Sequence, residues 1–268
     1  MIDQEQTFLS HLVELRDRLL RAILAILVVF LCLMPWASEI YDFLAHPMML
    51  ALPEGTKMIA TGVVTPFLVP VKVTVMVAFV IALPIVLYQA WAFIAPGLYA
   101  HEKRLGLPLV IASTLLFIVG MAFCYFFVFG VVFKFINEFA PKSITPAPDI
   151  EQYLSFVLTM FIAFGVTFEV PVIVIVLVRM GIVSLQKLRE IRPYAIVGAF
   201  VIAAVVTPPD VMSQLLLAIP LVLLFEVGLL LARFVEKPAA VSHYTALTDQ
   251  EMERELDQAE ADSRKNPP

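Results

Sequence analysis

The sequence predicts an all-α, polytopic membrane protein with six transmembrane helices in one domain, residues 1–235. The chain of 268 residues is 61% hydrophobic and 15% charged, with a mean hydropathy of +0.92. A soluble domain typically has only about 45–50% apolar residues. Six apolar runs are separated by polar loops, and a bilayer core requires about 20 apolar residues per helix. Lys and Arg gather in alternate loops, as they do in polytopic membrane proteins.

The first three spans follow an amphipathic start. Apolar residues recur at helical spacing from Phe8 to Leu19, which is typical of a helix at a membrane interface. Residues 38–70 contain four prolines, and we expect an ordered loop there with a short helix broken by Pro47. We predict the spans at Leu19–Ala37, Val71–Ala95 and Leu105–Phe133, the last of which is unusually long.

The last three spans are predicted at Tyr153–Val178, Tyr194–Val206 and Val211–Ala232. The fifth has 13 residues, which make a helix of about 20 Å, short of the ~30 Å bilayer core. Gln214 and Glu226 interrupt the sixth, so we expect spans 5 and 6 to be short and the bilayer around them to be thinned. Residues 236–268 carry eight acids and four bases and predict a disordered, acidic cytoplasmic tail.

The distribution of Lys and Arg predicts the orientation. An even number of spans places both termini on one side, and that side carries eleven Lys and Arg residues in or beside its loops against four on the other. The positive-inside rule therefore predicts that both termini lie in the cytoplasm. We expect no cleavable signal peptide, and Cys32 and Cys124 lie within apolar runs, so they suggest neither a disulfide nor a metal pair.

A loop at the predicted cytoplasmic face carries the first functional candidate. Pro96 and Gly97 predict a turn, and Glu102 follows it, just before the third span. Glu14 lies on the same face. Each carboxylate has two interpretations. One is a solvated charge or an ion pair, such as Glu14 with Arg18 at i,i+4. The other is a pair of carboxylates that each bind a guanidinium bidentately, which an ammonium cannot match.

Glu169 lies deep in the fourth span, where a charge costs roughly 2.5–3.5 kcal/mol. Glu169 has two interpretations. In the functional one it is a proton relay or a polar contact for a partner helix. In the structural one it is a protonated side chain that bonds to the carbonyl of Thr167, which Pro171 leaves free. Asp210 is interpreted first as an N-cap of the sixth span, Gln214 as a hydrogen-bonding group for another helix, and Glu226 as a side chain that snorkels.

The sequence lacks a metalloprotease motif, a phosphate-binding glycine-rich loop and a nucleophile elbow, so we predict neither an enzyme nor a cofactor or metal site. Two other classes remain open. A proton-coupled solute carrier would use Glu169 as its proton site, although the second half does not repeat the first. A structural assembly factor would tolerate charge reversal at Glu102.

Several blocks of sequence, in order, resemble the TatC family, the signal-peptide receptor subunit of the twin-arginine protein translocase. The similarity extends to about Phe234. The blocks are His11-Leu-Val-Glu-Leu-Arg16, Tyr88-Gln-Ala-Trp-Ala-Phe-Ile-Ala-Pro-Gly-Leu, His101-Glu102, Ser155-Phe-Val, Phe164-Gly-Val-Thr-Phe-Glu169-Val-Pro171, Lys187-Leu-Arg189, Arg192-Pro-Tyr194 and Thr207-Pro-Pro-Asp210 with Gln214.

The resemblance implies a cup-shaped fold in the bacterial inner membrane. It implies that Arg-Arg signal peptides of folded cargo proteins bind at a cytoplasmic site formed by Glu14, Glu102, Arg16, Leu19 and Phe93. It also implies roles in transport for Pro47, Glu169 and Asp210, with Glu169 on the concave side. The implied partners are single-span TatB-like and TatA-like subunits that dock near span 5 and in the concave face, and the driving force is the proton gradient.

Overall fold

The computed structural model describes residues 2–51, 58–94, 103–139, 147–207 and 210–235, and the predicted tail at 236–268 lies outside them. Within these ranges the chain is helical, apart from a single β-bridge between Ile59 and Asp149. Five of the described helical segments are long and apolar enough to cross a membrane, and Arg192–Val206 is a shorter apolar helix. These segments correspond to the six predicted spans.

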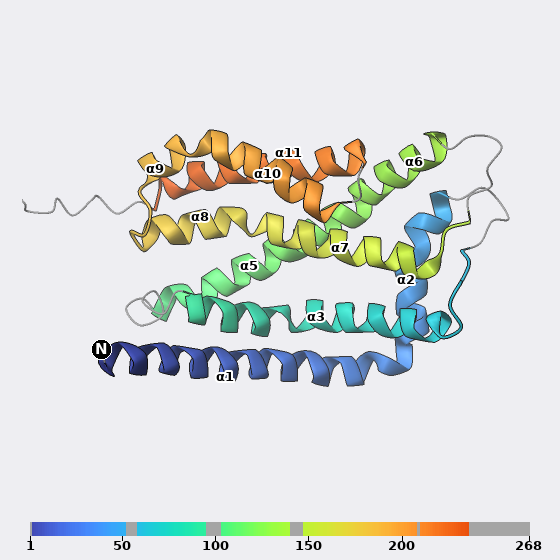
Figure 1. The fold of residues 1–268 in the computed structure, drawn as a ribbon, viewed down its shortest axis with the longest axis horizontal. Coiled ribbons are helices and arrows are strands. Elements are labelled where there is room, and N and C mark those ends of the chain that lie inside the picture. Colours follow the sequence, from blue (N-terminus) through green and yellow to red (C-terminus); the bar gives the residue numbers. More distant parts are fainter. Residues whose placement is uncertain (1, 52–57, 95–102, 140–146, 208–209, 236–268) are drawn as a thin grey trace, which may run out of the picture.

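The first span is longer than predicted. The amphipathic start and the apolar run form one helix, α1 (Ile2–Leu33), and a short 3₁₀ turn leads into α2 (Ala37–Ala51). Helix α2 runs across the ends of the other helices (Figure 1). It continues through Pro47, so the prediction that Pro47 breaks this helix is wrong. Proline removes one hydrogen bond, which leaves the carbonyl of Phe43 free, and the Tyr125 hydroxyl donates to that carbonyl instead.

The second and third spans also extend beyond their predicted bounds. Helix α3 (Thr65–Ile94) begins before Val71, because Pro66 lies in its first turn, where a missing N–H costs no helical hydrogen bond. The third span consists of α5 (Lys103–Phe123), a π-helical turn η2 (Cys124–Val128) and α6 (Phe129–Phe139). A π turn holds one extra residue per turn, so it changes the direction in which the side chains point.

The fourth span is divided at Glu169 into α7 (Ile150–Phe168) and α8 (Val170–Arg179). Pro171 causes this break, since it lacks the N–H that would continue the ladder. The short α9 (Leu185–Glu190) then leads to α10 (Arg192–Val206) and α11 (Val211–Ala232).

Helix α10 is short, as predicted: its 15 residues make about 22 Å. Helix α11 has 22 residues and is long enough to cross a membrane, so the prediction that the sixth span is also short is wrong. The polar residues Gln214 and Glu226 do not interrupt this helix, because each of them hydrogen-bonds to a residue of α10.

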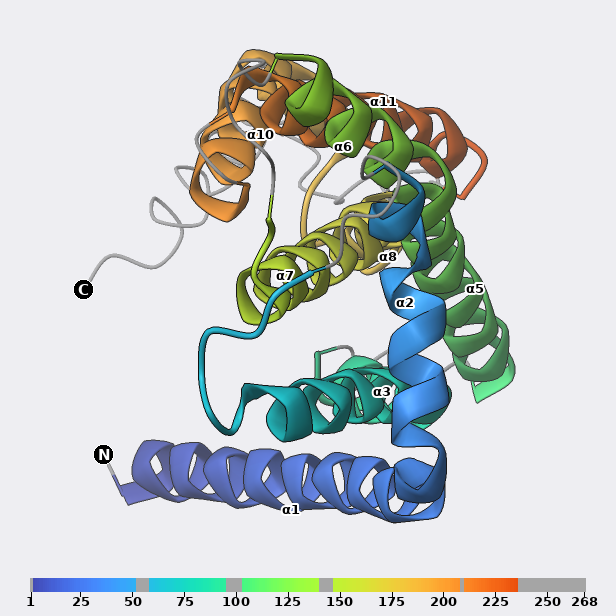
Figure 2. The same ribbon diagram turned by 90° about the vertical axis from the view of Figure 1, so that its right-hand side faces the viewer.

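The helices lie in a curved row with α1 and α10 at its two ends and α7 near its middle (Figure 2). The core lies around α7, where Val157, Met160 and Phe164 are fully buried. One end of the bundle holds the start of α1, the end of α3 and α9, and we call it the α9 end. The other holds α2 and the end of α6, and we call it the α2 end (Figure 1).

Two segments that are far apart in the sequence are joined at the α2 end. The main chain of Ile59 bonds to Pro148 and Ile150 at 3.0 and 2.9 Å. Asp149 accepts hydrogen bonds from the amide and hydroxyl of Thr61 and also caps the first turn of α7. These bonds, led by the one from the Thr61 hydroxyl, hold the pKa of Asp149 below its ordinary value. The connection fixes the start of α7 relative to the chain that leads into α3.

Candidate functional site

At the α9 end, Glu14 lies on α1 and already holds a guanidinium. Its Oε1 accepts hydrogen bonds from two nitrogens of Arg18, Nε at 2.9 Å and the terminal nitrogen at 2.6 Å. The predicted i,i+4 ion pair is therefore present. Arg18 is the more buried partner, with 22% of its side chain exposed against 43% for Glu14. The carboxylate is thus the more solvent-accessible partner of the pair.

The second oxygen of Glu14 faces a pair of stacked rings. His11 Nδ1 lies 3.9 Å from Oε2, which is too far for a hydrogen bond. The His11 ring stacks on Phe93 of α3 with centroids 4.4 Å apart. Phe93 therefore lies near Glu14, as the resemblance implied, with the His11 ring between them. His11 was not among the site residues predicted from the sequence. The spacing of three residues between His11 and Glu14 is the signal that could have identified it.

Arg16 and Leu19 lie on another part of α1. Arg16 donates to Asp17 through Nε at 2.9 Å and a terminal nitrogen at 2.8 Å, and it does not pair with Glu14. Leu19 is 56% exposed, so it offers an apolar contact one turn further along. Both side chains are accessible from outside the bundle. Glu102 lies outside the described residues, as does the rest of its loop, between the end of α3 and the start of α5.

Glu169 occupies the break between α7 and α8 and is 6% exposed. Ser113 of α5 lies beside it, yet neither carboxylate oxygen makes a well-formed hydrogen bond within the described part of the chain. The main-chain N–H of Glu169 donates to the carbonyl of Val166 at 3.1 Å and is also directed at that of Thr167, and the bond from the carboxyl to Thr167 that the structural alternative required is not formed. A buried carboxyl without a partner is costly, which is typical of a group kept for a function.

The remaining candidates have structural partners. Asp210 caps α11, and its Oδ1 accepts from the Ser213 amide at 2.7 Å, as predicted. Gln214 donates to the carbonyl of Phe200 on α10 at 3.4 Å, so it links two helices as predicted, through a long bond. Asp210 thereby caps the start of α11, and Gln214 links the first turn of α11 to α10.

Glu226 does not snorkel away from the protein. It accepts a hydrogen bond of 2.8 Å from Arg192, the first residue of α10. This ion pair was not predicted, because the two residues are far apart in the sequence. It joins α10 and α11 at the α9 end, opposite the end at which Gln214 joins them.

Residues 10–220 match the family model described as Sec-independent protein translocase protein (TatC). The Sec-independent protein translocase protein TatC of Escherichia coli strain K12 is 51% identical over 233 residues, which cover 87% of this chain and 90% of that protein. The protein of the same name from Haemophilus influenzae is 52% identical over 235 residues, with 88% and 92% covered.

A solved structure, described as the crystal structure of the twin arginine translocase receptor TatC, superimposes with a TM-score of 0.74. Its sequence is 40% identical, and the match covers 84% of this chain and 99% of that one. The family model, the relatives and the solved structure agree. The chain belongs to the TatC family and is therefore a component of a protein translocase rather than an enzyme.

Proposed function

We propose that this chain binds Arg-Arg signal peptides of folded cargo proteins at its α9 end. There it nucleates assembly of the channel that exports those proteins across the inner membrane, driven by the proton-motive force. The observation that carries the proposal is the environment of Glu14. Its Oε1 binds the Arg18 guanidinium, and His11 Nδ1 lies 3.9 Å from its Oε2, beyond hydrogen-bond distance.

The Oε2 atom of Glu14, which Arg18 does not occupy, suits an incoming guanidinium. Oε2 can accept a charge-assisted hydrogen bond, and the stacked rings of His11 and Phe93 offer a flat surface beside it. A planar guanidinium uses both features, whereas an ammonium is a point charge that stacks poorly. Glu102 would hold the second arginine of the motif. Arg16 and Leu19 would contact the residues that follow, Leu19 through its exposed apolar side chain.

The α9 end faces the cytoplasm in this proposal. The positive-inside rule supports this orientation, since eleven Lys and Arg residues lie in or beside the loops of that side against four on the other. Both termini and the Glu102 loop then share the cytoplasmic side with Glu14. Pro47 and Asp210 lie at the periplasmic side, where they would act in transport by fixing α2 and the start of α11.

Single-span TatB-like and TatA-like subunits would dock on α10 and in the concave face. Val197, Val201 and Val205 follow one another at i,i+4 spacing on α10, and all three are more than half exposed. Such an apolar stripe on a helix at the end of the row suits packing against another transmembrane helix. Glu169 and Gln214 would then offer polar contacts to helices that enter from the concave side.

The test is export of a folded fluorescent protein carrying an Arg-Arg signal peptide, in cells whose only TatC-family protein is this chain. Export should fall by at least tenfold for Glu14→Ala and for Glu102→Ala, since each removes a charge-assisted hydrogen bond. Glu190→Ala is the matched control, because Glu190 is an exposed carboxylate of α9 that accepts a hydrogen bond from Gln186 of the same helix. Unchanged export in both test variants would show that the site lies elsewhere.

A further inference from the structure

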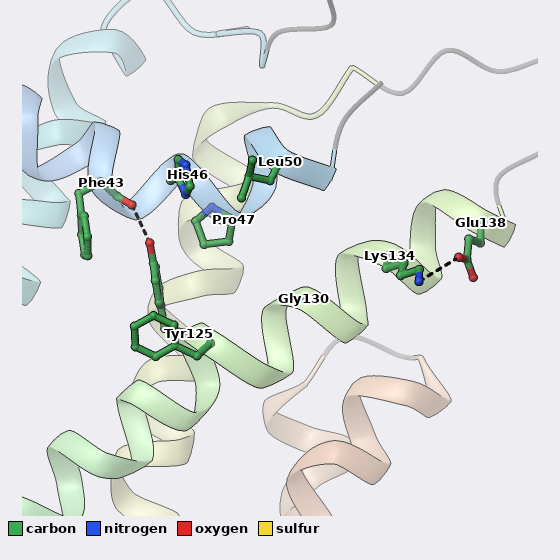
Figure 3. Close-up of a pocket in the computed structure, with 9 residues that line it drawn as sticks. Phe43, His46, Pro47, Leu50, Tyr125, Gly130, Lys134 and Glu138 are labelled. Carbon is green, nitrogen blue, oxygen red and sulfur yellow. Dashed lines mark hydrogen bonds and ion pairs between the residues drawn. The ribbon is translucent and has the colours of Figure 1, made fainter. Parts of the chain in front are cut away.

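We propose that a groove at the α2 end holds one phospholipid with a primary ammonium in its headgroup. The groove lies between α2 and the η2–α6 segment, and we call it the α2–α6 groove. Its outer part has a volume of about 900 Å³ and is lined by Phe43, His46, Pro47, Tyr125, Lys134 and Glu138 (Figure 3). An inner part of about 260 Å³ lies next to it, and the side chains of Phe43, Tyr125 and Phe126 form the boundary that the two parts share.

Three features of the backbone keep the groove open. Pro47 leaves the Phe43 carbonyl free, and the Tyr125 hydroxyl donates to it at 3.0 Å, which holds the Tyr125 ring across the groove (Figure 3). The π turn η2 keeps Cys124 and Val128 buried while Phe126 is 79% exposed. Gly130 has no side chain, and a Cβ placed there would meet no atom within 4 Å. π turns often occur at functional sites, which fits a binding groove.

The inner part accepts only apolar groups. It is lined by residues of α3 and α5 such as Val77, Val80, Ile118 and Met121, which reach toward the middle of the bilayer. Its one side-chain hydroxyl, on Tyr125, is already bonded to Phe43. Water would therefore find almost no partner there, and a dry apolar cavity open to lipid is filled most favourably by hydrocarbon.

Among the residues that the structure describes, the outer end carries one cation and one anion a helical turn apart, both on α6. Lys134 Nζ lies 3.8 Å from Glu138 Oε1, and both side chains are largely exposed. His46 lines the opposite wall, on α2 (Figure 3). A phosphate can accept hydrogen bonds from Lys134 and His46, while a neighbouring ammonium can donate to Glu138. This arrangement matches a phosphoethanolamine headgroup, in which phosphate and ammonium are adjacent.

The dimensions fit one leaflet. Ile118 and Lys134 are 16 residues apart along nearly continuous helix, which is about 24 Å. Half of a bilayer that is 40–45 Å thick with its headgroups is about 20–22 Å. A helix of a partner subunit fits less well, because with its side chains it is about 10–12 Å across, far thicker than a single acyl chain.

The experiment is native mass spectrometry of the full chain in detergent, mixed with equal amounts of phosphatidylethanolamine, phosphatidylcholine and phosphatidylglycerol. We expect one phosphatidylethanolamine per chain, retained in preference to the other two. Gly130→Leu places an apolar side chain in the groove, where its Cβ would meet no atom within 4 Å, and should reduce this retention about tenfold. Gly198→Leu on α10 is the matched control, since a Cβ there also meets nothing within 4 Å and the residue lies outside the groove.

Glu138→Ala gives an independent test, because this residue is exposed and its loss should leave the fold intact. It should abolish the preference for phosphatidylethanolamine over phosphatidylcholine, whose quaternary ammonium cannot donate a hydrogen bond. Equal retention of all three lipids, or retention that Gly130→Leu does not change, would overturn the proposal. So would a dimer of this chain that carries no bound lipid and is lost in Gly130→Leu, because the groove would then be an interface between copies.

Discussion

Arg18 binds Glu14 through a single carboxylate oxygen, so the ion pair on α1 uses only half of the capacity of that carboxylate. The other oxygen lies beside His11, which stacks on Phe93 of α3. An arginine from a signal peptide would therefore enter a place where the protein already supplies a competing arginine. Removing Arg18 should therefore strengthen peptide binding, whereas removing a binding residue would weaken it.

Arg18→Gln should strengthen binding of an Arg-Arg signal peptide by about two- to fivefold. The substitution removes a cation that repels the peptide and frees Oε1, the oxygen that Arg18 occupies, and a partly exposed ion pair is worth up to about 1 kcal/mol. Fluorescence anisotropy of a labelled peptide with the purified protein measures the dissociation constant. Weaker binding would contradict the competition and would make Arg18 a positioning residue for Glu14.

Tyr125→Phe should destabilise the protein by about 1 kcal/mol, because it removes the hydroxyl that satisfies the Phe43 carbonyl. The cost should shrink when Pro47→Ala is also present, since the new N–H can bond to the same carbonyl. A double-mutant cycle of unfolding free energies measures this coupling. Additive effects would mean that Pro47 and the Tyr125 hydroxyl do not act on one acceptor.

Gly165→Ala should lower the thermal stability, with a cost of about 1–3 kcal/mol for overpacking. A Cβ at Gly165 on α7 would overlap the ring of Phe117 on α5, so the two helices would have to separate. Gly198→Ala on α10 is the control, because nothing lies within 4 Å of its added Cβ. Both variants are compared with the parent protein by thermal unfolding in one detergent. If Gly165→Ala unfolds at the same midpoint temperature as the parent protein, close packing at Gly165 is ruled out.

Asp149 should stabilise the α2 end at neutral pH and lose this effect in acid. Its pKa is held below the ordinary value of 3.8 by the hydroxyl of Thr61 and by main-chain amides. The stabilisation is therefore complete above that value and disappears as the pH falls through the lowered pKa. Asp149→Ala should be less stable than the parent at pH 7, and the difference should narrow below about pH 4. A difference that stays constant with pH would exclude the ionised carboxylate as its source.

Local sequence signals predicted the parts of the fold that depend on neighbouring residues. The bounds of α11 were predicted because Asp210 supplies an N-cap and polar residues follow Ala232. The pair of Glu14 and Arg18 followed from their i,i+4 spacing. The family resemblance added Phe93, which lies near Glu14 through His11.

Contacts between distant segments could not be predicted in the same way. The π turn at Cys124–Val128 accompanies a bond from Tyr125 to α2, and no periodicity in the sequence marks it. The bonds of Asp149 to Thr61 join residues 88 positions apart. Likewise, the pair of Arg192 and Glu226 becomes apparent only when α10 and α11 are packed together.

The most direct test of the proposed function is the affinity of the purified chain for a signal peptide whose two arginines are intact or both replaced by lysine. We expect the Arg-Arg peptide to bind at least tenfold more tightly, because only guanidinium groups can bond bidentately and stack. Glu14→Ala and Glu102→Ala should each bring the affinity for Arg-Arg close to that for Lys-Lys, and Glu190→Ala should not. Equal affinity for both peptides, unchanged in the two test variants, would contradict recognition of arginine at this site.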